Sequence, residues 1–169
     1  MIKTLEEIVR DRILILDGAM GTMIQQYALT EEDFRGYRYR KTPGLMKGNN
    51  DMLNITRPDV VSDIHRKYLD AGADIITTNT FSSQRISQAD YHLEESAREM
   101  ALAGARLARK AADEFATAGR PRFVAGSVGP TNKTCSMSPD VSNPAAREID
   151  YLTLYDVYLE QIEALVEGG

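Results

Sequence analysis

The chain has 169 residues, of which 43% are hydrophobic and 27% are charged, so it can form a globular core and is neither disordered nor fibrous. Its net charge of -5 argues against an electrostatic nucleic-acid binder, because its Lys and Arg residues are scattered along the chain. The single cysteine, Cys135, excludes an internal disulfide and a Cys/His zinc cluster.

The amino-terminal segment does not resemble a signal peptide, because Glu6, Glu7 and Asp11 stand where such a peptide is apolar. No apolar run approaches the ~20 residues that span a bilayer. We therefore expect a cytoplasmic protein that binds no membrane.

A short helix is predicted at the amino terminus. Thr4 and Glu7 have the spacing of a capping box, and Leu5, Ile8 and Val9 fall on one face. We expect this helix to cover the base of the first strand.

The first strand is predicted at Ile13–Leu16, where four consecutive aliphatic residues suit a strand covered on both faces of a parallel sheet. Asp17 follows at its carboxyl end, and Gly18 and Gly21 let the backbone approach a ligand closely. Because the carboxyl ends of parallel strands carry the chemistry in α/β folds, this stretch indicates a cradle for a small zwitterion.

Two other interpretations of this stretch stay open. Gly18 and Gly21 also suit a simple turn of the chain with no ligand. A nucleotide site is favoured less, because the two glycines match only part of the G-x-G-x-x-G pattern and no helical pattern follows at once.

The next region is predicted to hold a helical turn over 23–27 and a helix start at Thr30 and Asp33, followed by a long loop over 34–54. A structureless loop of about 20 residues within a domain is usually functional. Its apolar residues favour a packed functional loop over a linker.

A helix is predicted from Thr56 to Leu69, because Pro58 and Asp59 suit a first turn and apolar residues recur at helical spacing. Gly72 ends it.

The second strand is predicted at Asp74–Phe81, which is short and rich in β-branched residues. Like the first strand, it runs into polar residues at its carboxyl end, which makes Thr78, Asn79 and Thr80 candidate site residues. An Asx turn formed by Asn79 alone is the alternative.

The remaining pattern is a helix from Leu93 to about Ala118, a third strand at Phe123–Val128, and a loop over 136–144. Asp150 then caps a last helix with an apolar stripe. The stripe consists of Leu152, Tyr155, Leu159, Ile162, Leu165 and Val166.

Strand, polar loop and amphipathic helix recur three times, which predicts an α/β fold of repeated βα units whose strand ends share one pocket. A (β/α)8 TIM barrel typically needs ~250 residues, so we expect residues 1–169 to be an amino-terminal portion, truncated before a fourth strand. Open sheet edges would remain, so self-association of two copies as a non-catalytic module is an alternative role.

Several segments resemble the homocysteine-binding domain of cobalamin-dependent methionine synthases, a (β/α)8 barrel shared with betaine- and S-methylmethionine-homocysteine methyltransferases. The Asp-Gly and Asn-Thr-Phe motifs belong to the wider family, and the runs over 47–51 and 129–132 narrow the resemblance to the cobalamin-dependent branch. The segments are Leu16-Asp-Gly-Ala-Met-Gly-Thr22, Lys47-Gly-Asn-Asn-Asp51, Ala71-Gly-Ala-Asp-Ile-Ile76, Thr78-Asn-Thr-Phe81, and Gly129-Pro-Thr-Asn132 through Ser138-Pro-Asp-Val141.

The resemblance implies transfer of a methyl group from methylcobalamin, recharged by 5-methyltetrahydrofolate, to zinc-activated homocysteine, giving methionine. It also implies folate-, cobalamin- and activation-type domains in the parent chain. Thr77 departs from the family pattern, which has an acidic residue there. The residues implied to hold homocysteine are Asp17, Gly18, Ala19, Met20, Thr78, Asn79, Thr80, Gly126 and Ser127.

The zinc ligands of that family are three cysteines on later strands, and Cys135 matches none of them. His65 and His92 are expected at the surface. We therefore expect no metal ligand and no catalytic residue in this portion, and an isolated chain that neither retains zinc nor forms methionine. Betaine or S-methylmethionine stays an alternative methyl donor.

Overall fold

The computed structural model describes residues 4–169, so the first three residues of the predicted barrel portion lie outside the described residues. Its sheet has two parallel strands, β1 (Ile75–Thr77) and β2 (Phe123–Ala125), with Ile76 opposite Val124. The chain is therefore a helix-rich α/β protein with a small parallel sheet, in agreement with the predicted class. Both strands are shorter than the apolar runs that predicted them.

The predicted first strand is present only in part. Leu16 makes a single parallel bridge to Ile75, and the Ile75 N–H donates to the carbonyl of Ile15 over 3.1 Å. The expected burial is wrong, because Ile13 is 88% exposed and Leu16 is 57% exposed. The physical reason is that, within residues 4–169, this segment is bordered by β1 on one side and by no strand on the other.

The predicted amino-terminal helix is α1 (Leu5–Asp11), and Thr4 and Glu7 form the expected capping box. The next helix, α2 (Met20–Gln25), begins three residues before the predicted turn at Met23. A helix therefore follows the glycine turn directly.

The helix α3 (Glu31–Arg35) begins with the predicted capping box of Thr30 and Asp33. The long loop predicted over 34–54 is shorter than expected, because only residues 36–49 lack a helix.

A 3-10 turn, η1 (Asn50–Met52), and the helix α4 (Leu53–Thr56) form the end of the predicted loop. The carboxylate of Glu31 accepts hydrogen bonds from the backbone N–H groups of Met46 (2.9 Å) and Lys47 (2.7 Å) and holds the loop on α3. The Met46 side chain is fully buried. The loop is therefore packed, as predicted, and is no linker.

The predicted helix is α5 (Pro58–Asp70), and Gly72 follows its end, where the backbone has φ +108°. The long helix α7 (Ala97–Phe115) starts four residues after the predicted start at Leu93 and ends three residues before Ala118. No helix within the described residues has the length and apolar content needed to cross a bilayer. Three short helical turns precede α7, namely α6 (Arg85–Gln88), η2 (Ala89–Tyr91) and η3 (Glu94–Ser96).

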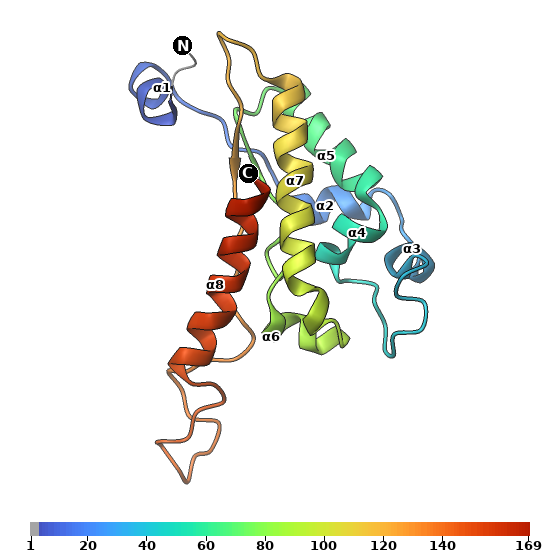
Figure 1. Ribbon diagram of the computed structural model, residues 1–169, viewed down its shortest axis with the longest axis vertical. Helices are drawn as coiled ribbons and strands as arrows, with labels where there is room; N and C mark the ends of the chain where they lie inside the picture. The colour runs from blue at the N-terminus through green and yellow to red at the C-terminus, as the bar shows by residue number, and fades with distance from the viewer. Residues whose placement is uncertain (1–3) are drawn as a thin grey trace.

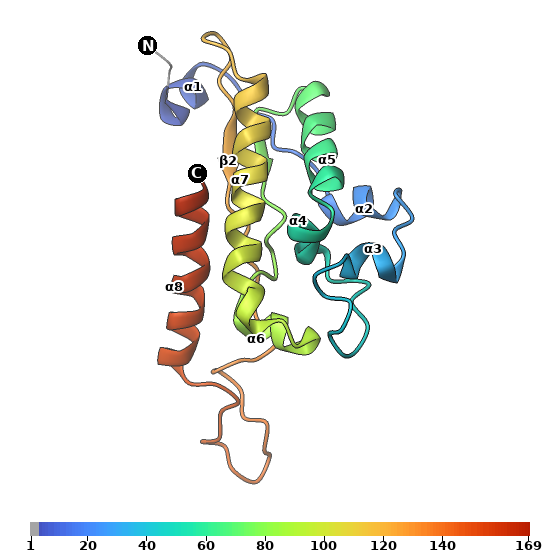
Figure 2. The same ribbon diagram turned by 45° about the vertical axis from the view of Figure 1, so that its right-hand side comes forward.

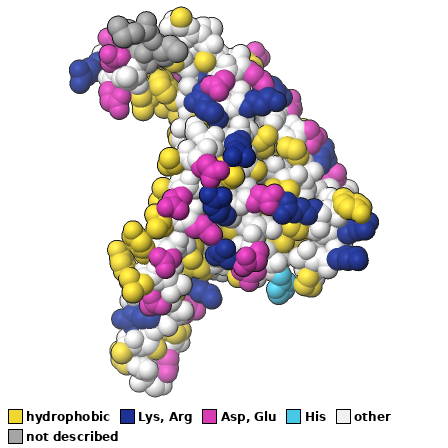
Figure 3. All heavy atoms as spheres, viewed as in Figure 1, with side chains coloured by type: hydrophobic (Ala, Val, Ile, Leu, Met, Phe, Trp, Pro, Cys, Tyr) yellow, Lys and Arg dark blue, Asp and Glu magenta, His cyan; other side chains and the backbone are white. Residues whose placement is uncertain are grey.

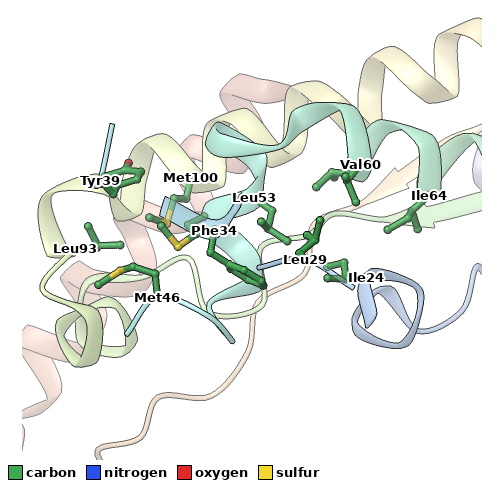
Figure 4. Close-up of a cluster of buried hydrophobic side chains, with 12 residues drawn as sticks. Ile24, Leu29, Phe34, Tyr39, Met46, Leu53, Val60, Ile64, Leu93 and Met100 are labelled. Carbon is green, nitrogen blue, oxygen red and sulfur yellow. The ribbon is translucent and has the colours of Figure 1, made fainter. Parts of the chain in front are cut away.

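The larger core cluster lies between α5, α7 and the segments 24–53 (Figure 4). Phe34, Leu53 and Ile64 are buried at its centre, and Met100 reaches it from α7. A smaller cluster joins α7 to the sheet through alanines, which allow the helix to approach the strands closely. The alanine-rich helix therefore packs closely on the sheet.

The last helix, α8 (Tyr151–Gly168), is capped by Asp150 as predicted and lies beside α7 (Figures 1 and 2). The contact is very close, because a Cβ added at Gly168 would lie 2.4 Å from the Cβ of Ala105.

The apolar stripe predicted on the last helix, α8, is mostly exposed. Leu165 is buried, but hydrophobic side chains line the outer face of α8 (Figure 3). The close contact with α7 is made at a small residue of α8, because a Cβ at Gly168 would meet Ala105, Leu102 and Arg106. The exposed residues are Leu152, Tyr155, Leu159, Ile162 and Val166.

The predicted surface position is correct for His92 and wrong for His65, which is fully buried on α5. Neither ring nitrogen of His65 has a hydrogen-bond partner among the described residues. Burial lowers the pKa of His65 from 6.5 to about 4, because the apolar interior disfavours the charged ring.

We expect His65 to make the protein sensitive to mild acid. Because its pKa is lower in the folded state, the unfolded chain binds more protons between pH 6.5 and 4, and stability falls as the pH falls through this range. The loss from this group alone is roughly 3 kcal/mol. In a His65→Leu variant, the free energy of unfolding, measured by urea denaturation, should fall by that much less over this range.

The matched control is His92→Asn, because Asn tolerates the left-handed backbone at His92 (φ +55°). This variant should keep the pH dependence of the wild type. Parallel curves for His65→Leu and the wild type would contradict the assignment.

Candidate functional site

A cavity of about 360 Å³ lies at the carboxyl ends of segment 13–17, β1 and β2. These three segments run parallel, so their carboxyl ends meet at one edge of the sheet. Asp17, Asn79 and Ser127 therefore border one cavity, as the sequence predicts. The lining residues are Asp17, Gly18, Met20, Gly21, Gly48, Asn49, Asn50, Asp51, Thr77, Thr78, Asn79, Thr80, Phe81, Ser82, Tyr91 and Ser127.

The half-buried carboxylate of Asp17 is held by the end of β1. The Thr77 N–H donates to Oδ2 over 2.8 Å, and the Thr77 hydroxyl donates to Oδ1 over 2.7 Å. Burial raises the pKa of Asp17, although both hydrogen bonds act in the opposite direction. Thr77, the departure noted in the sequence, is thus a hydrogen-bond donor to Asp17 where an acidic side chain would repel it.

The turn after Asp17 packs against a tyrosine that sequence reasoning assigned only to an apolar stripe. The Tyr68 hydroxyl donates to the carbonyl of Ala19 over 3.2 Å. A Cβ at Gly18 would lie 2.9 Å from the same hydroxyl, so only glycine fits without a shift. The position of Tyr68 in the sequence did not predict this contact, because the contact depends on how α5 packs against the turn.

Two predicted site residues lie outside the lining of the cavity. Ala19 is exposed and caps α2. Gly126 faces α8 instead, where a Cβ would lie 3.1 Å from the Leu165 side chain. Both positions follow a strand, but alternate residues of an extended chain point to opposite sides.

Thr78, Thr80 and Ser127 form a closed set of hydrogen bonds that joins the ends of β1 and β2. The Ser127 N–H donates to the Thr78 hydroxyl (2.8 Å), the two threonine hydroxyls lie 2.6 Å apart, and the Thr80 hydroxyl donates to the Ser127 carbonyl (2.8 Å). Their side chains thus hold the cavity wall together. Their contact with a ligand stays a prediction.

Asn79 connects β1 to the loop that precedes α5. Its amide donates to the Asn50 carbonyl over 2.8 Å and to the Asn54 side chain over 3.2 Å. The Asn54 amide in turn donates to the carbonyls of Asn79 (2.7 Å) and Met100 (3.0 Å). These bonds cross between distant segments, so they do not form the local Asx turn considered as an alternative.

Several lining residues were not assigned to the site from the sequence. They include the segment 48–51, Thr77, Phe81, Ser82 and Tyr91. Asp51 is buried, and its Oδ2 accepts hydrogen bonds from the Ser82 N–H (2.7 Å) and the Ser83 hydroxyl (2.8 Å). Burial raises the pKa of Asp51 to about 6. The polar run at 47–51 was the available signal, because polar residues within a packed loop need partners.

A zinc site does not fit the residues present. Zinc sites in proteins use three or four Cys, His or carboxylate ligands. Within the described residues, no group of three such side chains lies close enough to hold a metal ion, and Cys135 is a free, half-buried thiol.

A family model described as homocysteine S-methyltransferase matches residues 14–169. The homocysteine methyltransferase MmuM from Escherichia coli is similar in its metallated form, with 21% sequence identity and a TM-score of 0.70. The match covers 98% of this chain and 54% of that one.

Two further structures of MmuM are also similar. The oxidized form has 22% identity and a TM-score of 0.70, and covers 98% of this chain and 53% of its own. The apo form has 20% identity and a TM-score of 0.62, and the match covers 98% of this chain and 49% of that one. The likeness shows a shared fold, and this chain spans about half the length of these structures.

We expect Gly104 on α7 to be required for the position of the cavity wall. A Cβ there would lie 2.5 Å from Thr80 and 2.6 Å from the Asn54 amide. Gly104→Ala should therefore lower the free energy of unfolding by about 1–3 kcal/mol through overpacking. It should also shift the amide NMR signals of both contacted residues.

Gly119→Ala is the matched control, since nothing lies within 4 Å of a Cβ at that position. Equal stability of the two variants would show that α7 accommodates the added methyl group.

Proposed function

Because the chain belongs to the homocysteine S-methyltransferase family, we propose that it supplies part of the site where such an enzyme binds homocysteine for methyl transfer to sulfur, giving methionine. The observation that supports this most directly is the Asp17 carboxylate in the cavity at the strand ends. A carboxylate held in place by the neighbouring strand β1, through Thr77, is suited to bind the α-ammonium group of an amino acid.

The proposed architecture is the amino-terminal portion of a (β/α)8 barrel, comprising about three βα units within residues 1–169. The parallel order of segment 13–17, β1 and β2 supports it, as does the length of the similar structures, of which the match covers about half. On this proposal, the wall of the cavity is completed by polypeptide outside these residues.

The roles proposed for this chain concern binding. Asp17 pairs with the ammonium group, and the backbone at Gly18 and Met20 contacts the carboxylate of the substrate. Ala19, which lies outside the cavity lining, is given no contact. The hydrogen bonds between the hydroxyls of Thr78 and Thr80 and the backbone of Ser127 shape the pocket. No proton transfer or bond breaking is assigned to these residues.

We propose methylcobalamin, recharged by 5-methyltetrahydrofolate, as the methyl donor of the complete enzyme, with folate-, cobalamin- and activation-type domains beside this one. The runs at 47–51 and 129–132 support this branch of the family. Zinc and a cytoplasmic location are part of the same proposal. Betaine or S-methylmethionine as donor is the alternative, and the presence of cobalamin and folate domains in the same protein distinguishes them.

We expect Asp17→Asn to weaken the binding of homocysteine. A hydrogen bond to a charged group contributes about 1.5–3 kcal/mol, so the Kd should rise by about 10-fold to 150-fold. The measurement is an NMR titration of the chain with homocysteine. Asp156→Asn, at an exposed position on α8, is the control and should leave the Kd unchanged.

A Kd for Asp17→Asn equal to that of the wild type would remove Asp17 from the site. If the wild-type chain shows no binding of homocysteine, the proposed function itself is contradicted.

A second candidate role, self-association, is favoured by the exposed apolar side chains at both edges of the fold. Ile13, Ile15 and Leu16 lie along one edge, and the outer stripe of α8 lies at the other. An exposed apolar patch of this extent is typical of an interaction surface. Two copies that pair through these faces would cover them.

If this role is correct, sedimentation equilibrium at micromolar concentration should find a dimer, and Ile162→Glu should convert it to a monomer. Leu45→Glu, at an exposed site in the loop over 36–49, is the control that should leave the dimer intact. A wild-type monomer would contradict self-association.

A further inference from the structure

The charge of the cavity comes from two carboxylates. Asp17 and Asp51 line it, and no Lys, Arg or His does so within residues 4–169. A cavity with this balance attracts a cation and repels a second anion unless N–H or O–H donors are present.

Asp51 differs from Asp17 in its burial and in its hydrogen bonds. It is 5% exposed and forms no ion pair with any described residue. Both of its hydrogen bonds, from Ser82 and Ser83, reach Oδ2, which leaves Oδ1 without a protein donor in the described part of the chain.

Burying a carboxylate without a cation costs free energy, because the carboxylate loses its hydration. Two neutral hydrogen-bond donors compensate for that loss only in part. Its pKa of about 6 has the same cause. A ligand cation placed in the cavity would lower this cost, so the free protein favours ligands that carry one.

Two hydrogen-bond donors beside Asp51 are also free of protein partners in the described chain. They are the side-chain amide of Asn50 and the hydroxyl of Tyr91, both of which line the cavity. Glycines leave room in front of them. The Asn50 nitrogen lies 3.5 Å from the Cβ position of Gly21, and the Tyr91 hydroxyl lies 3.8 Å from that of Gly48.

We propose that Asp51 is a second anchor for the α-ammonium group of the substrate, and that Asn50 and Tyr91 donate hydrogen bonds to its carboxylate. This inference rests on the proposed function and extends its site from the strand ends to the segment 48–51. The amino-acid end of the ligand then lies between two protein segments, held together by the hydrogen bond from Asn79 to the Asn50 carbonyl.

The arrangement also orients the ligand. With the ammonium group held at Asp17 and Asp51, the sulfur at the other end of homocysteine points away from both carboxylates, toward the side of the cavity that these residues do not enclose. This orientation also keeps a thiolate away from their negative charge. Selection therefore depends on the ammonium and carboxylate groups, and the sulfur is left accessible to a reaction partner.

The test uses three ligands in NMR titrations of the whole chain: homocysteine, 3-aminopropane-1-thiol, which lacks the carboxylate, and 4-mercaptobutanoate, which lacks the ammonium group. Asp51→Asn should weaken homocysteine and the aminothiol by about tenfold or more. It should not weaken 4-mercaptobutanoate, because that ligand has no cation to pair.

Tyr91→Phe and Asn50→Ala should give the complementary result, with weaker binding of homocysteine and 4-mercaptobutanoate and unchanged binding of the aminothiol. Ser83→Ala keeps the charge of Asp51 and removes one of its donors. If Asp51→Asn fails to fold, Ser83→Ala should still weaken the two ammonium ligands selectively, because it frees the carboxylate to move.

Two results overturn the inference. One is an Asp51→Asn variant that binds homocysteine as the wild type does, and the other is an equal loss for all three ligands, which indicates a general change of shape. If Asp17→Asn weakens homocysteine and Asp51→Asn does not, this inference fails and the proposed function stands. If the wild type binds none of the ligands, both fail.

Discussion

The carboxylate of Asp74 fixes the three extended segments to one another at the end of the sheet opposite the cavity. It is fully buried and accepts hydrogen bonds from the Arg12 guanidinium (2.7 and 2.8 Å), from Arg122 (3.2 Å) and from the Ile15 N–H (3.1 Å). Arg12 holds the pKa of Asp74 well below its usual range. Because these donors come from the first segment and from the residue before β2, one side chain aligns the starts of three parallel segments. Removing one donor would leave the buried Asp74 charge with one partner fewer, which is strongly unfavourable. This cost disfavours any other alignment of the three segments.

Because Asp74 aligns the starts of the three segments, it also determines which residues meet at their carboxyl ends. Parallel segments that start level also finish level, so Asp17, Asn79 and Ser127 reach the same cavity from three different parts of the chain. Short polar bonds then join the ends, from Thr80 to the Ser127 carbonyl and from Asn79 to the Asn50 carbonyl. The paired polar groups of Thr78, Asn79 and Thr80 make this part of the wall rigid. The rigidity lies on the side of the cavity that these residues enclose.

The sequence predicted those features that depend on neighbours in the chain. Capping boxes at Thr4 and Thr30 begin helices because donor and acceptor are three residues apart, and polar residues after a strand reach the site because strands are parallel. It failed where the answer depends on a distant element. His65 is buried on α5, which packs against α7, and most of the large apolar side chains of α8 are exposed, while Gly168 contacts α7. Asp51 was missed for the same reason, since its place in the cavity depends on Ser82 and Ser83.

The division between enclosed and open sides has a consequence for the proposed chemistry. The enclosed side carries carboxylates, amides and hydroxyls, which can recognise an ammonium and a carboxylate group but cannot activate a thiol, because a nearby negative charge disfavours a thiolate. The exposed apolar side chains, Ile13 and the outer face of α8 among them, lie at the edges where the sheet has no further strand within residues 4–169. A protein segment that packs on those edges would also enclose the open side of the cavity. In the proposed orientation of homocysteine, the sulfur points toward this side. Recognition of the amino-acid end and activation of the sulfur would then belong to different parts of the complete site, and burial of the same apolar surface would couple their assembly.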